Sequence, residues 1–347
     1  MIIDSIGSLS ERIRGKKAKF LLVIGTTDVS LIPGITVAGA TPELTMFTPA
    51  ADAEYLITGK CKVINGVPIT PDGIPTPALL TRASLSFMNI DKLVVNAGAR
   101  VTPRIPYLDL HGEPGQDIRN GGIRKEVGER IIENGITLGE SLSDEGILVI
   151  GESIPAGTTT AAAVLTGLGF DGIKTVSSSS PNNPKDIKRA IVEEAIRKSP
   201  SNLMDRIFWL SDPVLLGVSA VTIGFKGLVI LAGGTQMTAV AAIVKELEPR
   251  RLSEIGIVTT RWVVRDSSAS IVEASKEIGV NLSYSNVNLS GSQYEGLRVY
   301  ERGFVKEGVG AGGSMALALS NGSSEGELVK RIDEYYSDLI NADNKAI

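Results

Sequence analysis

The sequence predicts an α/β fold, a Rossmann-like parallel sheet with helices on both faces. Short apolar runs, rich in β-branched residues, recur along the 347 residues. Between them lie stretches in which apolar side chains have helical spacing. The chain also holds 38 glycines, which suit the many tight turns of such a fold. Alternating strands and helices imply parallel pairing through right-handed crossovers.

Five apolar runs have the length and composition of fully buried strands. They are Lys19–Thr26, Lys92–Ala97, Gly146–Gly151, Leu228–Ala232 and Ile255–Thr259. Helices are predicted where apolar residues recur along one face of a helix. These stretches are Gly122–Asn134, Pro184–Ser199, Thr235–Glu248 and Ser267–Ile278.

Both ends of the chain are predicted to be helical and to form a small helical subdomain. Residues 323–340 have a charged amphipathic pattern, and helix is also expected in the first twenty residues. We therefore expect a main α/β domain at residues 20–320. A helical appendage made of residues 1–19 and 321–347 is expected beside it.

Composition excludes several classes of protein. Hydrophobic residues make up 43% of the chain and charged residues 21%, so a packed core is expected. The net charge of −4 leaves no positive surplus for a nucleic-acid backbone. The single cysteine, Cys61, excludes an internal disulfide, and the single histidine, His111, excludes a three-histidine zinc site.

A long apolar segment at residues 214–244 raises the question of a membrane span, because Lys226 is its single charge. Glycines at five positions interrupt the segment, and Gln236 and several threonines lie within it. We therefore favour a buried strand flanked by helices over a membrane span. The first twenty residues lack the apolar stretch of a signal peptide, so a cytoplasmic protein without membrane contact is expected.

A Gly-Thr-Thr-Thr turn at residues 157–160 follows the third predicted strand and opens an alanine-rich helix. Free N–H groups at a helix start, together with hydroxyls, attract an anion such as phosphate. The alternative is a simple cap made by Thr158 or Thr159. No P-loop lysine accompanies the turn, which argues against a nucleoside triphosphate.

Two further turns offer similar groups. Four serines, 177–180, precede a helix that carries Lys188, and Gly233-Gly234-Thr235 opens another helix. Ordinary solvated loops would look the same in sequence. Since ligands bind beyond the carboxyl ends of parallel strands, we expect the turns to converge on one anion site. Two long Gly/Pro-rich loops, Thr27–Thr48 and Pro103–Gly122, are predicted to reach over it.

The segment Gly308–Gly313 fits the dinucleotide pattern G-x-G-x-x-G, but only 34 residues follow it. They cannot complete a dinucleotide fold, so this interpretation is rejected. Instead, Gly308 and Gly310 are predicted to let the backbone approach a ligand while Glu307 faces it. A carboxylate among apolar neighbours has a raised pKa and acts as a base. The alternative is a glutamate that caps a helix.

Asp109, His111 and Asp117 lie within nine positions and offer oxygen and imidazole ligands for a metal ion. A solvated loop is the simpler interpretation, and no metal site is predicted. A metal-dependent α/β hydrolase built on these residues stays open as an alternative function.

Five blocks together carry a resemblance to a known family. They are 151–163 (GESIPAGTTTAAA), 188–196 (KRAIVEEAI), 232–242 (AGGTQMTAVAA), 292–297 (SQYEGL) and 306–318 (KEGVGAGGSMALA). In this order they resemble the nicotinate-nucleotide–dimethylbenzimidazole phosphoribosyltransferase family, most closely its divergent archaeal-type branch.

The resemblance implies an activity. Such enzymes move phosphoribose from nicotinate mononucleotide to 5,6-dimethylbenzimidazole or a related base, which gives an α-ribazole-phosphate-type nucleotide for cobamide (cobalamin) biosynthesis. It also implies a parallel α/β sheet with terminal helices, a homodimer, small-molecule substrates and no cofactor. A purine acceptor, and a non-catalytic nucleotide- or base-binding protein, stay open as alternatives.

The resemblance also assigns roles to residues of this sequence. Glu307 would be the general base. The nucleotide and its phosphate would be bound by Gly157, Thr158, Thr159, Ser178, Lys188, Gly234, Ser292, Gly308 and Gly310. The accepting base would be bound by Pro75, Thr76, Pro77 and Val305.

The sequence also departs from the family pattern. Ile154-Pro155-Ala156-Gly157 replaces Gly-Ile-Gly-Asn, and Phe304 stands in place of an arginine. Lys306 is a basic residue that the bacterial pattern lacks. These changes concern the identity of the substrates more than the class of reaction.

Overall fold

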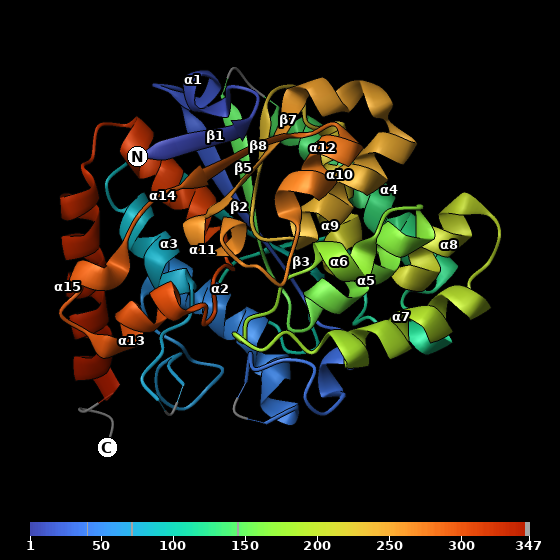
Figure 1. Ribbon diagram of the computed structural model, residues 1–347, viewed down its shortest axis with the longest axis horizontal. Helices are drawn as coiled ribbons and strands as arrows, with labels where there is room; N and C mark the ends of the chain where they lie inside the picture. The colour runs from blue at the N-terminus through green and yellow to red at the C-terminus, as the bar shows by residue number, and fades with distance from the viewer. Residues whose placement is uncertain (40, 71, 144–145, 344–347) are drawn as a thin grey trace.

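The computed structural model describes residues 1–39, 41–70, 72–143 and 146–343, and the strands found there form one sheet (Figure 1). The strand order is β1-β8-β7-β6-β5-β2-β3-β4. All neighbours are parallel except β1, which is antiparallel to β8. The strands are β1 (Ile2–Ile6), β2 (Ala18–Gly25), β3 (Asp91–Gly98), β4 (Leu108–Asp109), β5 (Ile147–Ser153), β6 (Val229–Ala232), β7 (Ile255–Thr260) and β8 (Asn281–Ser285).

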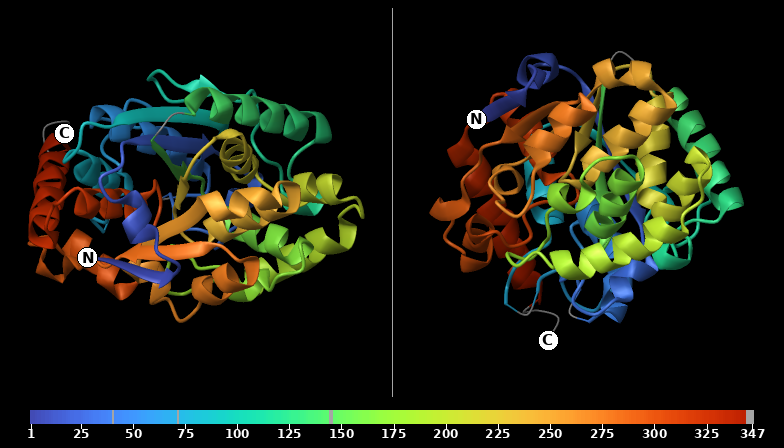
Figure 2. Two further views of the ribbon diagram at one scale, coloured as in Figure 1. Left: turned by 90° about the horizontal axis from the view of Figure 1, so that it is seen from above. Right: turned by 45° about the vertical axis from the view of Figure 1, so that its right-hand side comes forward.

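Helices cover both faces of this sheet, so the predicted α/β class is confirmed (Figure 2). The α-helices are α1 (Leu9–Ile13), α2 (Thr48–Thr58), α3 (Ala78–Leu85), α4 (Lys125–Leu142), α5 (Gly157–Gly167), α6 (Gly172–Thr175), α7 (Lys185–Lys198), α8 (Leu203–Leu210), α9 (Pro213–Gly224), α10 (Gln236–Leu247), α11 (Arg261–Val264), α12 (Ile271–Ile278), α13 (Glu295–Arg298), α14 (Ala311–Ser320) and α15 (Glu325–Asp343). Short 3₁₀ helices span Asp28–Leu31, Glu43–Phe47, Ile118–Asn120, Pro249–Glu254, Leu289–Gly291 and Val299–Arg302.

The side chains of β2 show how the two faces are buried. Leu21 and Val23 pack with helices α4, α5 and α7–α10 on one face. Phe20, Leu22 and Ile24 alternate with them and pack with α2, α3, α14 and α15 on the other. Figure 2 shows the C-terminal helices, in red, across the sheet from α5, α7 and α8, in yellow-green. A strand buried on both faces has a continuous apolar sequence, which is why this strand could be predicted from its sequence.

The five predicted strands correspond to β2, β3, β5, β6 and β7, and the predicted helices to α4, α7, α10, α12 and α15. The prediction of helix in the first twenty residues is wrong for residues 2–6. These residues form β1, because Ile2, Ile3 and Ile6 favour extended backbone and pair with β8. Helix α1 follows and packs mainly on β1 and β8, whereas α15 packs on α3. The proposed division at residues 19/20 and 320/321 stays a prediction.

The apolar segment 214–244 is a buried strand flanked by helices, as predicted. It comprises most of α9, all of β6 and most of α10. Helix α9 is apolar on all sides because it lies between α4, α10 and the sheet. Within the described part of the chain, no helix is both long and apolar enough to cross a bilayer.

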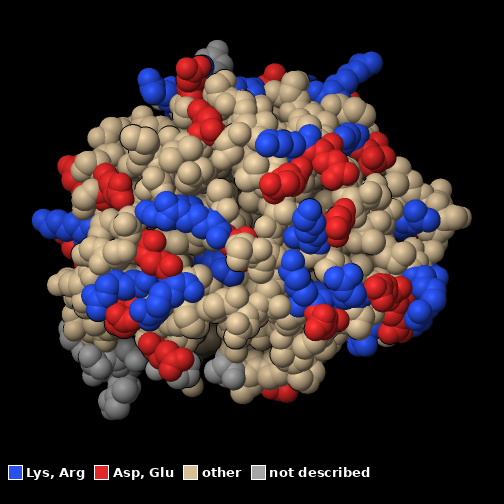
Figure 3. Space-filling model, viewed as in Figure 1, with Lys and Arg blue, Asp and Glu red and all other residues tan. Residues whose placement is uncertain are grey.

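Charges are mixed over the face seen in Figure 3. Lysine and arginine side chains alternate with aspartate and glutamate there, without a broad patch of one sign. This face therefore lacks the basic footprint that binds a nucleic-acid backbone.

Candidate functional site

A cavity of about 840 Å³ lies at the carboxyl ends of β5, β6 and β7. Glu152 and Ser153 line it from the end of β5, Gly234 from the turn after β6, and Val263 from the segment after β7. In open parallel sheets ligands bind at this edge, and the volume is in the range of small-molecule sites.

Two loops close the cavity on its outer side. The predicted loop Thr27–Thr48 contributes residues 35–39, 44, 47 and 48. The second predicted loop, Pro103–Gly122, contributes no lining residue among those described. Its place is taken by residues 63–65, 67–70, 72 and 74–76, of which the sequence analysis singled out Pro75 and Thr76.

The start of α5 and the start of α10 meet in the cavity, as the sequence predicted. Gly157 and Thr158 line it beside Gly234 and Gln236. A Cβ atom added to Gly157 would meet Nε2 of Gln236, so the two turns lie close together. The serine loop, residues 177–180, also lines the cavity, whereas the start of α7 does not. All three predicted turns therefore contribute to one cavity, although only two of the helix starts that follow them do so.

Glu307 lines the same cavity. Its Oε1 and Oε2 accept hydrogen bonds from the backbone N–H of Gly312, at 3.1 and 3.2 Å, in the first turn of α14. Burial of the carboxyl group raises the pKa of Glu307 to about 7, although the Gly312 and Gly308 N–H groups act to lower it. The side chain thus caps a helix and also presents to the cavity a carboxyl group that titrates near neutrality.

The backbone around Glu307 is strained. Positive φ angles occur at Gly303, Val305, Lys306, Gly308, Val309 and Gly310. For a branched residue such as Val305 (φ 62°) this conformation is costly and persists only where surrounding contacts hold it. Such clusters of strain are typical of functional sites. We call residues 303–310 the Glu307 loop.

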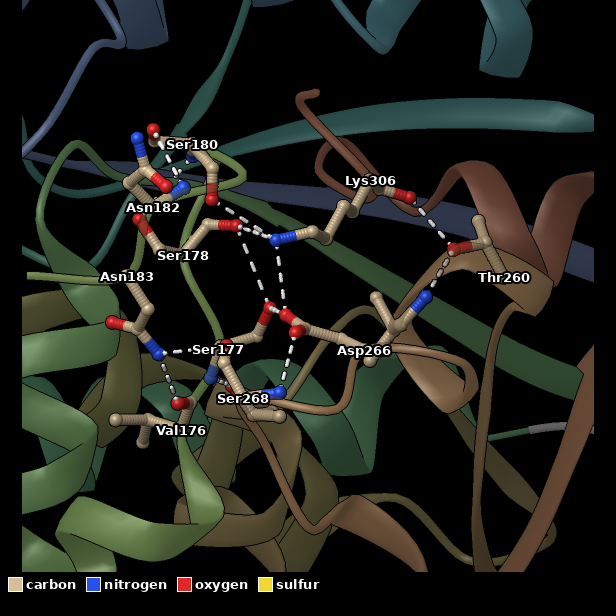
Figure 4. Close-up of polar contacts among 12 residues, drawn as sticks. Val176, Ser177, Ser178, Ser180, Asn182, Asn183, Thr260, Asp266, Ser268 and Lys306 are labelled. Atoms are coloured by element: carbon tan, nitrogen blue, oxygen red, sulfur yellow. Dashed lines mark hydrogen bonds and ion pairs between the residues drawn. The ribbon is translucent and has the colours of Figure 1, made fainter. Parts of the chain in front are cut away.

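Lys306 ties the Glu307 loop to the serine loop (Figure 4). Its Nζ lies 2.9 Å from Asp266 Oδ2 and donates to the carbonyl oxygens of Ser178 and Ser180, at 2.7 and 3.1 Å. Asp266 Oδ2 also accepts from Ser177 Oγ at 2.5 Å. The side chains of Lys306 and Asp266 are 4% and 7% exposed, so this ion pair is shielded from water.

Glu152 is a cavity residue that the sequence analysis missed. Its backbone oxygen accepts from Val309 N at 2.8 Å, and Gly151 and Gly310 approach too closely for side chains. Burial, then the nearby carboxyl groups of Glu307, Asp212 and Asp52, raise the pKa of Glu152 to about 8. Its place directly after a buried strand was the available signal. Near pH 7, Glu152 therefore keeps its proton more firmly than Glu307.

This raised pKa predicts how stability depends on pH. The folded chain holds the Glu152 proton more tightly than the unfolded chain, whose value is near 4.5, so this group's contribution falls as pH rises from about 4.5 to about 8. We expect Glu152→Gln to melt with the wild type at pH 5 but at least about 2 °C higher at pH 8. Thermal denaturation at both pH values measures this, and parallel curves for the two proteins would contradict it.

The predicted wall for the accepting base is partly present in the cavity. Pro75, Thr76 and Val305 line it. Pro77 does not, but it packs on the Glu307 loop: a Cβ atom on Gly308 would lie 3.1 Å from Pro77 Cγ. Gly308 itself lines the cavity, whereas Gly310 begins α14 behind it.

Three other predicted residues do not line the cavity. Thr159 is fully buried, and its hydroxyl has no partner among the described residues. Lys188 is fully buried, and its Nζ donates to Ser177 O at 2.6 Å and Asn183 Oδ1 at 2.9 Å. Lys188 therefore supports the serine loop from behind.

Ser292, the third of these residues, lies elsewhere, beside α15. Its hydroxyl donates to Asp333 Oδ1 at 2.5 Å, and neither residue lines the 840 Å³ cavity.

The loop with Asp109, His111 and Asp117 also lies outside the cavity. Asp117 pairs with Arg119, and Asp109 accepts from the backbone N–H of His111. Among the residues described, no group of three or more His, Cys, Asp or Glu side chains is placed to hold a metal ion. The hydrolase alternative therefore gains no support from the arrangement of this loop.

Comparison with solved structures identifies the fold. The chain is similar to nicotinate-nucleotide-dimethylbenzimidazole phosphoribosyltransferase from Thermus thermophilus, with a TM-score of 0.60 and 14% identity over 94% of this chain and 83% of that one. A structure of CobT from the same organism gives a TM-score of 0.58 and 14% identity over 97% and 88% of the two chains. The resemblance stated from sequence is confirmed as a shared fold.

Comparison by sequence identifies the family. No family model matches the chain. It is 70% identical to a UPF0284 protein of Metallosphaera sedula over 99% of both chains. It is 59% identical to a UPF0284 protein of Saccharolobus solfataricus over 95% of both chains. The chain therefore belongs to the UPF0284 family.

Proposed function

We propose that this chain is a phosphoribosyltransferase that moves phosphoribose from nicotinate mononucleotide to 5,6-dimethylbenzimidazole or a related base. The product would be an α-ribazole-phosphate-type nucleotide for cobamide formation. One observation carries the proposal: Glu307 and the turn at Gly157 and Thr158 line the same cavity. The fold shared with solved phosphoribosyltransferases supports it.

The donor phosphate is assigned to the starts of α5 and α10. The first turn of a helix has N–H groups without helical partners, and its dipole attracts anions. Among the described residues that line the cavity, Lys306 is the one lysine or arginine, and its Nζ already contacts Asp266, Ser178 and Ser180. The phosphate would therefore be held by N–H groups and hydroxyls such as that of Thr158.

The chemistry is a displacement at C1′ of the ribose. The bond from C1′ to the pyridinium nitrogen breaks, its electron pair goes to that nitrogen, and nicotinate leaves. A ring nitrogen of the base forms the new bond from the opposite side, so a β-linked donor gives an α-linked product. Fixing the phosphate and the base in line lowers the entropic cost of this step.

Glu307 is assigned the role of accepting the proton that the base loses. As the new bond forms, the second ring nitrogen of the base becomes acidic, and an ionised Glu307 accepts its hydrogen. A pKa of about 7 suits a base at neutral pH. Glu152 is assigned a neutral role beside it, because two adjacent buried carboxyl groups do not readily ionise together.

Incubation of the purified chain with nicotinate mononucleotide and a panel of benzimidazoles and purines tests the proposal. Mass spectrometry is expected to detect free nicotinate together with a new nucleotide that contains the added base. Binding of nicotinate mononucleotide without release of nicotinate would instead favour the non-catalytic alternative. The proposal includes a cytoplasmic homodimer, and light scattering on the purified chain tests the dimer.

Replacement of Thr158 tests the assignment of the phosphate. Thr158→Val keeps the shape of the side chain but removes its hydroxyl. We expect the KM for nicotinate mononucleotide to rise by about tenfold, the value of one hydrogen bond to a charged group. Affinity for the free base, measured by calorimetry, should stay near wild type. An unchanged donor KM would count against the assignment.

A further inference from the structure

A buried carboxylate joins two hydroxyl groups on the base side of the cavity. Asp52, on α2, is 4% exposed. Its Oδ1 accepts from Thr76 Oγ1 at 2.6 Å, and its Oδ2 accepts from Ser153 Oγ at 2.7 Å. Thr76 and Ser153 both line the cavity, and Asp52 lies behind them.

These hydroxyls lie near the assigned base, Glu307. Thr76 precedes Pro77, which packs on Gly308. Ser153 follows Glu152, whose backbone oxygen accepts from Val309 N at 2.8 Å. Thr76 and Ser153 are therefore each next in sequence to a residue that contacts the Glu307 loop, and we expect a base that reaches Glu307 to lie beside them.

The number of hydrogens and lone pairs on these groups determines what the two hydroxyls can offer a ligand. An ionised carboxylate has no hydrogen to donate, so each hydroxyl donates its single hydrogen to Asp52. Ser153 Oγ and Thr76 Oγ1 then have only lone pairs left, and one of those on Thr76 already accepts from Ala78 N at 3.3 Å. Toward the cavity, this pair accepts hydrogen bonds and cannot donate them.

Of the neighbouring groups, the protonated carboxyl of Glu152 offers one hydrogen, and those that follow donate none. The ionised carboxylate of Glu307 is also an acceptor. The carbonyl oxygen of Pro75 is occupied by the hydroxyl of Tyr300 at 2.9 Å, and Val305 adds apolar surface. This end of the cavity is thus rich in acceptors, and a methyl group placed against them would leave buried lone pairs unpaired.

We propose that Asp52, Thr76 and Ser153 select an accepting base that carries a hydrogen-bond donor, an amino or hydroxyl group, on the edge facing the two hydroxyls. The inference rests on the proposed function and narrows its acceptor. It favours aminated or hydroxylated benzimidazoles, and purines with an exocyclic amino group, over dimethylated benzimidazole.

Three benzimidazoles of similar size test this selection at pH 7.5. 5-Aminobenzimidazole offers a donor, 5-methoxybenzimidazole offers only an acceptor, and 5-methylbenzimidazole offers neither. We expect kcat/KM and affinity to be about tenfold or more in favour of the amino compound over the other two, as one added hydrogen bond requires. Equal values, or a preference for the methyl compound, would overturn the inference.

The affinity for each base, measured by calorimetry on the free protein, tests the same selection independently of turnover. If no base yields a nucleotide product, the proposed function fails, and the binding order still supports or overturns the inference.

Asp52→Asn probes the mechanism of selection. The amide oxygen accepts from one hydroxyl, while the amide NH₂ donates to the other, whose hydrogen then turns to the cavity. We expect the preference for the amino compound over the methoxy compound to fall by about tenfold or to invert. Retention of the wild-type preference in a folded Asp52→Asn protein would overturn the role of Asp52.

Asp4→Asn is the matched control. Asp4 also joins two serine hydroxyls, those of Ser10 and Ser283, each at 2.5 Å, but none of the three lines the cavity. The Asp4→Asn substitution removes the same charge from the same kind of cluster. The wild-type order of kcat/KM and affinity among the three bases is expected to persist. If Asp4→Asn changed the order as Asp52→Asn does, selection by the Asp52 cluster would be refuted.

Discussion

Glu307→Gln is expected to lower kcat by about 100-fold or more, with the KM for nicotinate mononucleotide close to the wild-type value. Glutamine keeps the size of the side chain, and its oxygen still accepts from Gly312 N, so α14 keeps its cap. The amide cannot take a proton from the base. Steady-state kinetics on protein with an unchanged circular dichroism spectrum measures the effect. A loss below tenfold would remove Glu307 from this role.

The pH profile of the wild type gives an independent check on Glu307. Because burial raises its pKa to about 7, the ionised form increases between pH 6 and 8, and kcat/KM should rise over that interval. The rise should be absent from the residual activity of Glu307→Gln. Glu254→Gln, which alters a surface pair with Arg12, is the matched control and should keep the wild-type profile.

Lys306→Met is expected to lower kcat by about tenfold or more and the free energy of unfolding by about 3 kcal/mol, because it leaves the buried Asp266 carboxylate without its cation. The kinetic loss has a separate cause. Without the Lys306 side chain, the strained Glu307 loop is held to the serine loop by the backbone bond from Val305 N to Ser179 O; it relaxes, and the carboxylate moves from the reacting nitrogen. Kinetics and denaturant unfolding measure the two effects.

Lys188→Met is the matched control for Lys306. Lys188 is equally buried and also binds the serine loop, through Ser177 O, but it does not contact the Glu307 loop. We expect a comparable loss of stability with a much smaller loss of kcat at saturating substrates. If both variants lost kcat equally, the effect of Lys306 would be one of general stability rather than of positioning Glu307.

The fold was predictable where burial leaves a plain pattern in sequence. β2 and β5 are enclosed on both faces, so their sequences are continuous apolar runs. β1 (IIDSI) and β8 (NLSYS) lie at one side of the sheet and are not continuous apolar runs, and β4 spans only two residues. Their pairing depends on distant partners, which local patterns do not show.

The site was predictable where chemistry sits at the end of a strand. The Thr158 turn (residues 157–160) was found in this way, whereas Glu307 was found from the glycines that follow it and from the family resemblance; Thr158 and Glu307 both line the cavity. Lys188 and Ser292 were assigned to the nucleotide, yet protein groups bind their side chains.

The carboxyl group of Asp52 carried no such signal, and Glu152 was missed although it directly follows a predicted strand. Their meaning depends on residues such as Glu307 and Thr76 that tertiary structure alone brings near. Sequence reasoning finds polar groups, but packing decides whether they face a ligand or another part of the chain.

The configuration of the product tests the central claim most directly. If the Thr158 turn and Glu307 act on one nucleotide in one cavity, a base must attack C1′ from the side opposite nicotinate. Proton nuclear magnetic resonance of the anomeric C1′ hydrogen should then show an α-linked nucleotide that forms as nicotinate is released. Release of nicotinate with free phosphoribose, or with a β-linked product, would contradict the account.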